Sequence, residues 1–397
     1  MQTNHHRMFR GALLITLISV LTFASTRLRA DGGGVCDGIV VTMPFGDVDG
    51  NPFYCQIAEA YSSGLTNGTT ESSYSPHDPV PREQMAAFVT RTMDQSLRRG
   101  SRRAALNQFW TPSSTDGLGL TTVGSGPEWV ESDGVDLWVT NFNDGTVARV
   151  RASDGRVLGT WTGAFGAYHL VVAKGLVFIS GFGPGNLFQI DPAQPAGAVT
   201  TVTNAIGQGP IGIAFDGSRI WTASQSGFIS IVTLNPVTVT MVSTGFAQPF
   251  NIMYDGANMW VTDQGGSSAR LLKLDSNGAI IQTVNVGLIP RSPAFDGTNI
   301  WVPNRASDSI TVVRASTGAV VATLTGNGLN GPQTAAFDGE RILVANFLGD
   351  SVSLWRATDL TPLGFVSTGS STSPSGVCSD GLNFWVVLNG TGKLARF

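Results

Sequence analysis

The sequence predicts an all-β protein, a seven-bladed β-propeller with a small N-terminal helical module. Three observations favour this fold class. An Asp-Gly pair followed by a bulky apolar residue recurs along the last two-thirds of the 397-residue chain, in steps of 39 to 42 residues. A fixed period of this size is typical of repeat architectures. The 49 glycines suit many tight turns, because glycine adopts positive φ without steric cost. The apolar content of 42% argues against disorder.

The repeat has seven copies, and one of them replaces Asp with Lys. They begin at Asp133-Gly134, Lys174-Gly175, Asp216-Gly217, Asp255-Gly256, Asp296-Gly297, Asp338-Gly339 and Asp380-Gly381. The bulky residue is Trp in five copies, Phe178 in the second and Leu343 in the sixth. A unit of this length holds four short strands, so we expect seven four-stranded sheets arranged around a channel.

Residues 1–30 have the layout of a secretory signal peptide. Arg7 and Arg10 precede the apolar run Gly11–Ala24, and small residues follow it. The run is shorter than the roughly 20 residues that a membrane span needs. We therefore expect a secreted or cell-envelope protein, cleaved after Ala24 or Ala30. The alternative is an uncleaved N-terminal anchor.

Charge and cysteine content narrow the function classes. Without residues 1–30 the chain has 20 basic and 28 acidic residues. This balance argues against nucleic acid as a partner, because nucleic-acid binding depends on Lys and Arg neutralising phosphates. Export allows a Cys36–Cys55 disulfide, while Cys378 lies in the seventh repeat and suits a buried apolar role. No Cys-x-x-Cys pair exists, and we expect neither a cofactor nor a bound metal.

Residues 36–97 form a separate module in this prediction. Asn51 and Pro52 suit the start of a helix, and Phe53, Ile57 and Tyr61 recur every four residues on one expected apolar face. A second helix is expected from Pro81 to about Leu97. An arginine-containing linker, 98–117, then leads to the propeller at 118–397.

The module resembles the S-layer homology (SLH) family. The residues that carry this resemblance are Phe45, Asp47, Val48, Gly64, Leu65, Gly68, Tyr74, Pro76, Val80, Arg82, Glu83 and Gln84. The resemblance implies a module that holds an exported protein to anionic cell-wall polysaccharide. It implies wall binding by Arg82, with Asp47 shaping the site. The alternative is a small helical domain that anchors nothing.

One repeat illustrates the expected blade. Its strands are Ile211–Asp216, Arg219–Ser224, Phe228–Leu234 and Thr238–Ser243, each rich in Val, Ile, Thr or aromatic residues and bounded by turn residues. The Trp of the second strand is expected to pack between blades. The seventh repeat ends after its third strand, and the strand Leu118–Val123 precedes the first repeat. We expect this strand to complete the seventh blade and close the ring.

The propeller resembles the YVTN and NHL repeat class, including virginiamycin B lyase-like members. Trp138-Val139-Thr140-Asn141, Trp260-Val261-Thr262-Asp263 and Trp301-Val302-Pro303-Asn304 carry this resemblance. Because one fold hosts many activities, the resemblance indicates architecture more than function.

Two rings of residues are expected at one end of the channel. The position after the repeat's Pro gives Glu128, His169, Ile211, Phe250, Arg291, Gln333 and Ser375. The end of the second strand gives Asn141, Gly181, Ser224, Asp263, Asn304, Asn346 and Leu388. Varied polar and aromatic residues that converge in this way suit binding of a small molecule, glycan or protein. The alternative is that they only solvate the channel mouth.

The sequence therefore favours an exported envelope protein whose SLH-like module anchors it and whose propeller binds a ligand. The resemblance to the lyases supplies a second hypothesis, a metal-dependent lyase or hydrolase. In that hypothesis His169 is the catalytic base, and Glu128 and Asp263 bind a metal. A structural surface-layer component is the third hypothesis. No Gly-x-Ser-x-Gly or His-Glu-x-x-His motif is present.

Overall fold

The computed structural model describes residues 32–36, 39–62, 66, 68–81, 85, 119–183, 185–265 and 269–397. The chain divides into two compact units, Met1–Ala105 and Leu106–Phe397. The predicted signal peptide and linker lie outside the described residues. Within these residues, no helix combines the length and apolar character needed to cross a membrane.

The N-terminal unit contains a hairpin and one helix in its described part. Strands β1 (Gly32–Cys36) and β2 (Ile39–Met43) pair antiparallel. A short 3-10 helix, η1 (Gly46–Val48), and the helix α1 (Tyr54–Ser62) follow. A disulfide joins Cys36 in β1 to Cys55 in α1. The hairpin and the helix share a small core, whose buried members are Met43, Phe45, Val48, Tyr54, Ile57 and Ala58.

The apolar face of α1 differs from the prediction at one position. Ile57 is buried and Tyr61 packs edge-on against Phe45. Phe53 precedes the helix and is 64% exposed, and Tyr54 takes its place in the core. The second predicted helix lies almost wholly outside the described residues, so the helical SLH-like module stays a prediction.

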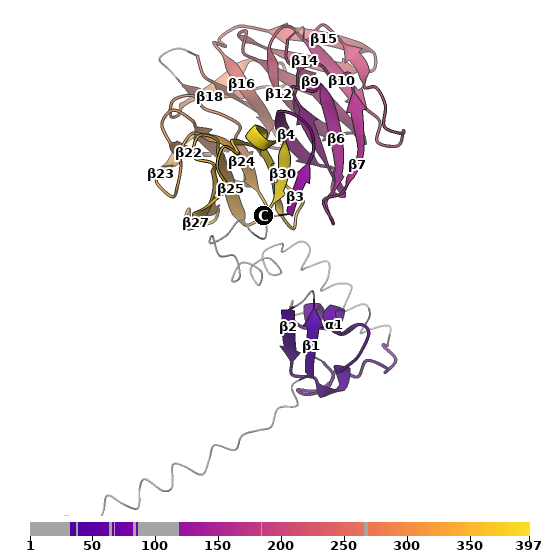
Figure 1. The fold of residues 1–397 in the computed structure, drawn as a ribbon. Helices are drawn as coiled ribbons and strands as arrows, with labels where there is room; N and C mark the ends of the chain where they lie inside the picture. Colours follow the sequence, from indigo (N-terminus) through magenta and orange to yellow (C-terminus); the bar gives the residue numbers. More distant parts are fainter. Residues whose placement is uncertain are drawn as a thin grey trace, which may run out of the picture. The chain divides into compact units, whose positions relative to one another are not determined.

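The second unit is a seven-bladed β-propeller, as the repeat predicts (Figure 1). Each blade is a four-stranded antiparallel sheet. The first four blades contain β4 (Pro127–Ser132), β5 (Asp136–Asn141), β6 (Thr146–Arg151) and β7 (Val157–Thr162); β8 (Ala167–Ala173), β9 (Leu176–Gly181), β10 (Asn186–Ile190) and β11 (Thr200–Thr203); β12 (Pro210–Phe215), β13 (Ile220–Ser224), β14 (Phe228–Leu234) and β15 (Val237–Val242); and β16 (Pro249–Tyr254), β17 (Met259–Asp263), β18 (Arg270–Leu274) and β19 (Ile280–Asn285).

The remaining three blades follow the same order. They contain β20 (Ala294–Phe295), β21 (Asn299–Asn304), β22 (Ser309–Arg314) and β23 (Val320–Thr325); β24 (Pro332–Phe337), β25 (Arg341–Asn346), β26 (Ser351–Arg356) and β27 (Pro362–Ser367); and β28 (Pro374–Ser379), β29 (Phe384–Leu388), β30 (Lys393–Arg396) and β3 (Gly119–Thr122), with the 3-10 helix η2 (Asn389–Thr391) between β29 and β30. The four strands predicted for the third repeat match β12 to β15 within one residue at each end.

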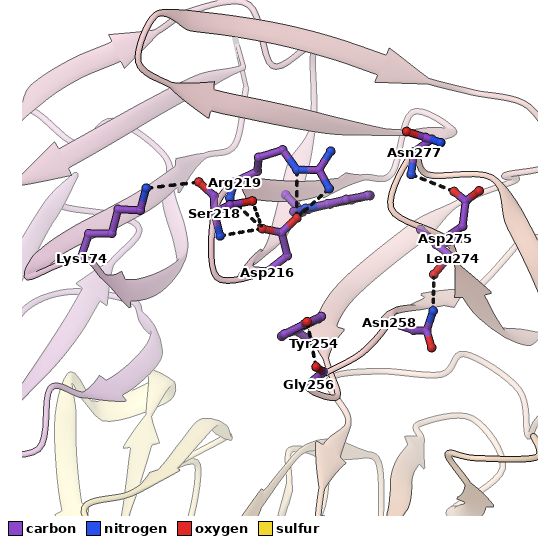
Figure 2. A network of polar contacts seen from close by, with 11 residues as sticks. Lys174, Asp216, Ser218, Arg219, Tyr254, Gly256, Asn258, Leu274, Asp275 and Asn277 are labelled. Carbon is purple, nitrogen blue, oxygen red and sulfur yellow. Dashed lines mark hydrogen bonds and ion pairs between the residues drawn. The ribbon is translucent and has the colours of Figure 1, made fainter.

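The repeated aspartate organises the turn between the first two strands of a blade. In the third blade, Asp216 Oδ1 accepts hydrogen bonds from the backbone N–H groups of Ser218 and Arg219, at 2.8 and 2.7 Å (Figure 2). Its Oδ2 accepts the indole N–H of Trp221 at 2.7 Å. Burial raises the pKa of Asp216, but these hydrogen bonds outweigh it and lower the pKa to about 2.

The same arrangement recurs wherever the repeat has both Asp and Trp. The indole-to-carboxylate distances are 2.7 or 2.8 Å in all five of these blades. Each of these Trp side chains is at most 1% exposed. Trp221 packs against Ile252 and Met259 of the next blade, which confirms the predicted role of the Trp between blades.

Two blades form the turn between their first two strands without an Asp–Trp hydrogen bond. In the sixth, Arg341 Nε replaces the indole and bonds to Asp338 Oδ2 at 2.9 Å. In the second, Ala173 pairs with Leu176, and the two residues between them, Lys174 and Gly175, both have positive φ. This is the pattern of a two-residue type I′ hairpin, which needs no aspartate.

The predicted closure of the ring is confirmed. Strand β3 pairs antiparallel with β30, with Leu120 opposite Ala395 and Thr121 opposite Leu394. The first described strand of this unit is thus the outer strand of the last blade (Figure 1). Pairing covers an edge of β30 that would otherwise be open.

Deleting residues 118–123 is therefore expected to destabilise the propeller. A chain that begins at residue 124 loses the β3–β30 pairing and should melt lower than one that begins at residue 106 by on the order of 10 °C. Thermal unfolding followed by circular dichroism measures the difference. Equal melting temperatures for the two chains would contradict the role given to β3.

Candidate functional site

The first strands of the blades begin at one end of the channel, which we call the mouth. The residue after the repeat's Pro position lies there in every blade. The register assigns this position to Glu128, Tyr168, Ile211, Phe250, Arg291, Gln333 and Ser375, the mouth ring. Six of these seven residues are those predicted from the sequence.

In the second blade the predicted mouth-ring residue is wrong by one position. Ala167 pairs with Gly181, as Pro127 pairs with Asn141 in the first blade. Tyr168 therefore occupies the mouth ring, and His169 lies one residue further along β8. The slip arises because Ala167 replaces the proline that marks the register in the other blades.

His169 is enclosed by aromatic side chains. It is 4% exposed, and its ring stacks on Trp129 of the neighbouring first strand with centroids 3.9 Å apart. Phe250 approaches it edge-on at 6.3 Å. Burial lowers the pKa of His169 to about 3, because a charged imidazole loses its hydration there. The imidazole is thus neutral at physiological pH, without the exposure expected of a residue that exchanges protons with a ligand.

The predicted second ring faces into the blades. Its polar members Asn141, Ser224, Asp263, Asn304 and Asn346 are all 0% exposed. Asn346 Nδ2 donates to the hydroxyls of Ser351 and Ser353 in the next strand, and Asn304 donates to the equivalent pair. These side chains hold the loops and the third strands in place.

Asp263 has a related structural environment. Its carboxylate accepts the backbone N–H groups of Ala247 and Gln248, at 3.1 and 2.6 Å, and forms an ion pair with Arg270. The oxygens of this carboxylate are therefore already paired with donors of the protein itself.

The residue after each of these positions is the one that approaches the mouth. Successive side chains of a strand point to opposite sides, so a residue at the strand end and its successor face different ways. The successors are Phe142, Phe182, Gln225, Gln264, Arg305, Phe347 and Asn389. In six of these, all but Asn389, the backbone N–H bonds to the segment that leads into the first strand. Reading each repeat one residue beyond the end of its second strand would have identified these residues from the sequence.

Two arginines and one glutamate meet at the mouth. Arg305 Nη1 donates to Gln333 Oε1 at 3.4 Å, and Asn389 Nδ2 donates to Glu128 Oε1 at 2.9 Å. Burial raises the pKa of Glu128 to about 7, against the lowering by the Asn389 hydrogen bond and the nearby positive charges. Burial and the charge of Arg305 lower the pKa of Arg291 to about 10.

Neither guanidinium has a carboxylate as an ion-pair partner among the described residues. The Nε of Arg291 is buried without a hydrogen-bond partner. Both groups instead lie over aromatic rings, Arg291 at 4.3 Å from the Phe250 centroid and Arg305 at 4.5 Å from that of Phe347. The mouth thus holds two cations whose hydrogen-bonding capacity is incompletely used.

An aromatic wall completes the mouth on the side of the first two blades. Phe142, Tyr168 and Phe182 contact one another with ring centroids 5.7 to 6.2 Å apart. Burial, and next the charge of Glu128, raise the pKa of Tyr168 to about 12, so its hydroxyl stays protonated and can donate a hydrogen bond.

The predicted wall-binding residues belong to the N-terminal unit. The carboxylate of Asp47 accepts the backbone N–H groups of Tyr74 and Ser75, at 2.9 and 2.7 Å, and so fixes that loop. Arg82 lies outside the described residues. Within the described part of the chain, no three His, Cys, Asp or Glu side chains gather where they could hold a metal ion.

Solved structures with the same fold include two kinds of enzyme. Virginiamycin B lyase from Staphylococcus aureus is 15% identical, with a TM-score of 0.61 over 70% of this chain and 98% of that one. A streptogramin B lyase is 16% identical, with a TM-score of 0.60 over 70% and 97%. Hydrazine synthase from Kuenenia stuttgartiensis is 16% identical, with a TM-score of 0.60 over 72% and 99%.

This similarity establishes the propeller fold and leaves the activity open. No protein-family model matches the chain, and comparison with curated protein sequences finds no match. The residues at the mouth therefore have to carry the functional argument.

The burial of His169 predicts a pH effect of known sign. Its pKa in the folded state lies below the ordinary value of 6.5. The unfolded chain therefore binds more protons between about pH 3 and 6.5, and stability is lost as pH falls through this range. The contribution of His169 to this change should be a loss of about 2 kcal/mol at pH 4.5 relative to pH 7, since one pKa unit corresponds to about 1.4 kcal/mol. The raised pKa of Glu128 acts in the opposite direction, so the contribution of His169 is the difference between the wild type and a His169 variant.

His169→Phe, which keeps an aromatic ring against Trp129, should remove most of this loss. Urea unfolding at both pH values, in the wild type and in the variant, measures it. Imidazole NMR signals of His169 that titrate near pH 6.5 in the folded protein would contradict the assignment.

Proposed function

We propose that the propeller is a binding platform, whose mouth recognises a ligand that carries an anionic group, such as an acidic glycan. The observation that supports this most strongly is the pair Arg291 and Arg305. Both guanidinium groups converge on the mouth, and neither has an ion-pair partner in the part of the chain that the structure describes. Guanidinium donors match carboxylate, sulfate or phosphate oxygens in geometry.

The neighbouring side chains support the same ligand class. Phe142 and Phe182 offer apolar faces on which a sugar ring or another flat group can lie. Gln333, Asn389 and the Tyr168 hydroxyl add neutral hydrogen-bonding groups. Ligand sites typically combine an aromatic lining with a few polar groups in fixed positions. Glu128 places one negative charge beside two positive ones, so the mouth keeps a net attraction for an anion.

We further propose that the chain is exported and held at the cell envelope by its N-terminal unit. The signal-like segment 1–30, the SLH-like residue pattern and the disulfide between Cys36 and Cys55 support this location. In this proposal Arg82 contacts anionic wall polysaccharide, and Asp47 acts indirectly by holding the loop at Tyr74. Sedimentation with purified wall polysaccharide tests the proposal, with Arg82→Ala expected to stay in the supernatant.

A lyase or hydrolase is the second candidate, and the shared fold with two lyases favours it. His169 is poorly placed for that role, because it is buried and its pKa is about 3. A catalytic reading would rest on Glu128, whose pKa of about 7 suits proton transfer near neutrality. Ligand binding needs fewer functional groups than the mouth already provides, and it needs no catalytic base.

The mouth proposal predicts a specific loss of binding. After a glycan array has identified an acidic ligand for the full chain, Arg291→Ala and Arg305→Ala should each weaken its binding by about tenfold or more. Added salt should weaken wild-type binding, because exposed charge interactions are screened. Arg356→Ala is the control, since Arg356 is an exposed residue of β26, away from the mouth, paired with Asp359.

Calorimetry on the three variants separates the outcomes. Ligand binding that survives in both mouth variants, or that falls equally in Arg356→Ala, would contradict the site. Turnover of the ligand during the titration would instead favour the second candidate.

A further inference from the structure

A cavity lies inside the channel, away from the mouth. Its volume is about 420 Å³, within the range of roughly 300–1,000 Å³ typical of small-molecule sites. Residues of all seven blades line it, and none of them belongs to the mouth ring. Its lining begins at Trp129, next to Glu128 of the mouth ring, and continues along the first strands towards the Asp-Gly turns. We call it the channel cavity.

The residues around the channel cavity are mainly apolar or aromatic, while polar groups supply about half of the surface exposed in it. Trp129, Phe215, Tyr254 and Phe337 contribute aromatic side chains from four different blades. Most of the other lining residues are aliphatic. Such walls favour the apolar body of a ligand, and the faces of aromatic rings attract cations.

Among the described residues that line the cavity, Glu131 is the only acidic one, and none is Lys, Arg or His. Among the described residues Glu131 has no ion-pair partner. Burial raises its pKa to about 7, with a smaller opposing effect of the nearby Trp129 indole. Cys378 lines the cavity from the adjacent first strand, and burial followed by the charge of Glu131 raises the pKa of its thiol. The thiol therefore stays neutral, and Glu131 supplies the one charge.

We propose that the channel cavity binds a small organic cation, an amine attached to an apolar body, with Glu131 as its counter-ion. An ammonium group placed beside Glu131 supplies an ion-pair partner, which the described residues do not provide, while aromatic rings surround the rest of the molecule. An anionic ligand would meet an uncompensated carboxylate there, and a neutral one would leave that carboxylate unpaired. The site is independent of the mouth and of the ligand proposed for it.

Phenethylamine and its neutral analogue 2-phenylethanol are suitable probes. We expect the wild-type full chain at pH 8, where Glu131 is ionised and the amine protonated, to bind the amine about tenfold or more tightly than the alcohol in calorimetry. Glu131→Gln should weaken amine binding by about tenfold and leave alcohol binding within about twofold. The substitution keeps the shape of the side chain and removes a buried charge, so the fold should persist.

Two further variants locate the site. Ser379→Leu, at a partly exposed lining position of the seventh blade, fills part of the cavity and should weaken binding of both probes. Glu128→Gln makes the same chemical change on the same strand, at the mouth, and should leave amine binding within about twofold of the wild type.

Three results would each overturn the proposal: no amine binding by the wild type at millimolar concentration, equal amine binding by wild type and Glu131→Gln, or a loss in Glu128→Gln as large as that in Glu131→Gln. The last result would place the amine at the mouth. None of these results bears on whether the mouth binds an anion, because that test uses another ligand and the two arginines.

Discussion

One aspartate carboxylate in each of five blades joins two levels of structure. Its Oδ1 accepts two backbone N–H groups of the turn, and its Oδ2 accepts the indole N–H of a Trp five residues later, as in Asp255 and Trp260. The Trp is buried in a core shared with the next blade, as Trp260 is with Ile300 and Val302. The same carboxylate therefore fixes a local turn and orients a side chain that fills the space between sheets. Without it the indole N–H would be buried without an acceptor.

This constraint acts near one end of the blades and leaves the other end variable. The Asp-Gly turns repeat with little change, while the mouth ring contains Glu, Tyr, Ile, Phe, Arg, Gln and Ser. A rigid scaffold with a variable rim is the usual arrangement for a binding site on a repeat fold. The two charged features of the channel follow the same logic. Arg291 and Arg305 are near the rim, Glu131 lies deeper, and none of the three forms an ion pair with another described residue.

The architecture could be predicted from the sequence because it rests on local signals that recur. Turn chemistry, strand composition and a fixed period all agree, and the unpaired strand before the first repeat indicated how the ring closes. The disulfide of the N-terminal unit could also be predicted, since only Cys36 and Cys55 lie outside the repeats. The mouth ring followed wherever proline marks the register.

The other features of the site depended on details that the repeat spacing does not specify. Ala167 hides the register of β8, which placed His169 at the rim in the prediction instead of Tyr168. Asn304 and Asn346 were expected to face the mouth but lie inside their blades, because a shift of one residue along a strand reverses the direction of a side chain. The channel cavity depends on residues from seven blades that are distant in sequence, and no local pattern signals it. The wall-binding role of Arg82 remains a prediction.

The central claim is that the repeated aspartate couples turn and inter-blade packing. A double-mutant cycle of Asp255→Ala and Trp260→Phe, read by urea unfolding, measures that coupling directly. The account predicts a loss of about 2–4 kcal/mol for Asp255→Ala and a coupling of at least about 1 kcal/mol between the two sites. Asp359→Ala, at an exposed turn where Asp359 pairs with Arg356 and Thr361, should cost much less than Asp255→Ala. Equal losses for the two aspartate variants, or additive effects of Asp255→Ala and Trp260→Phe, would contradict it.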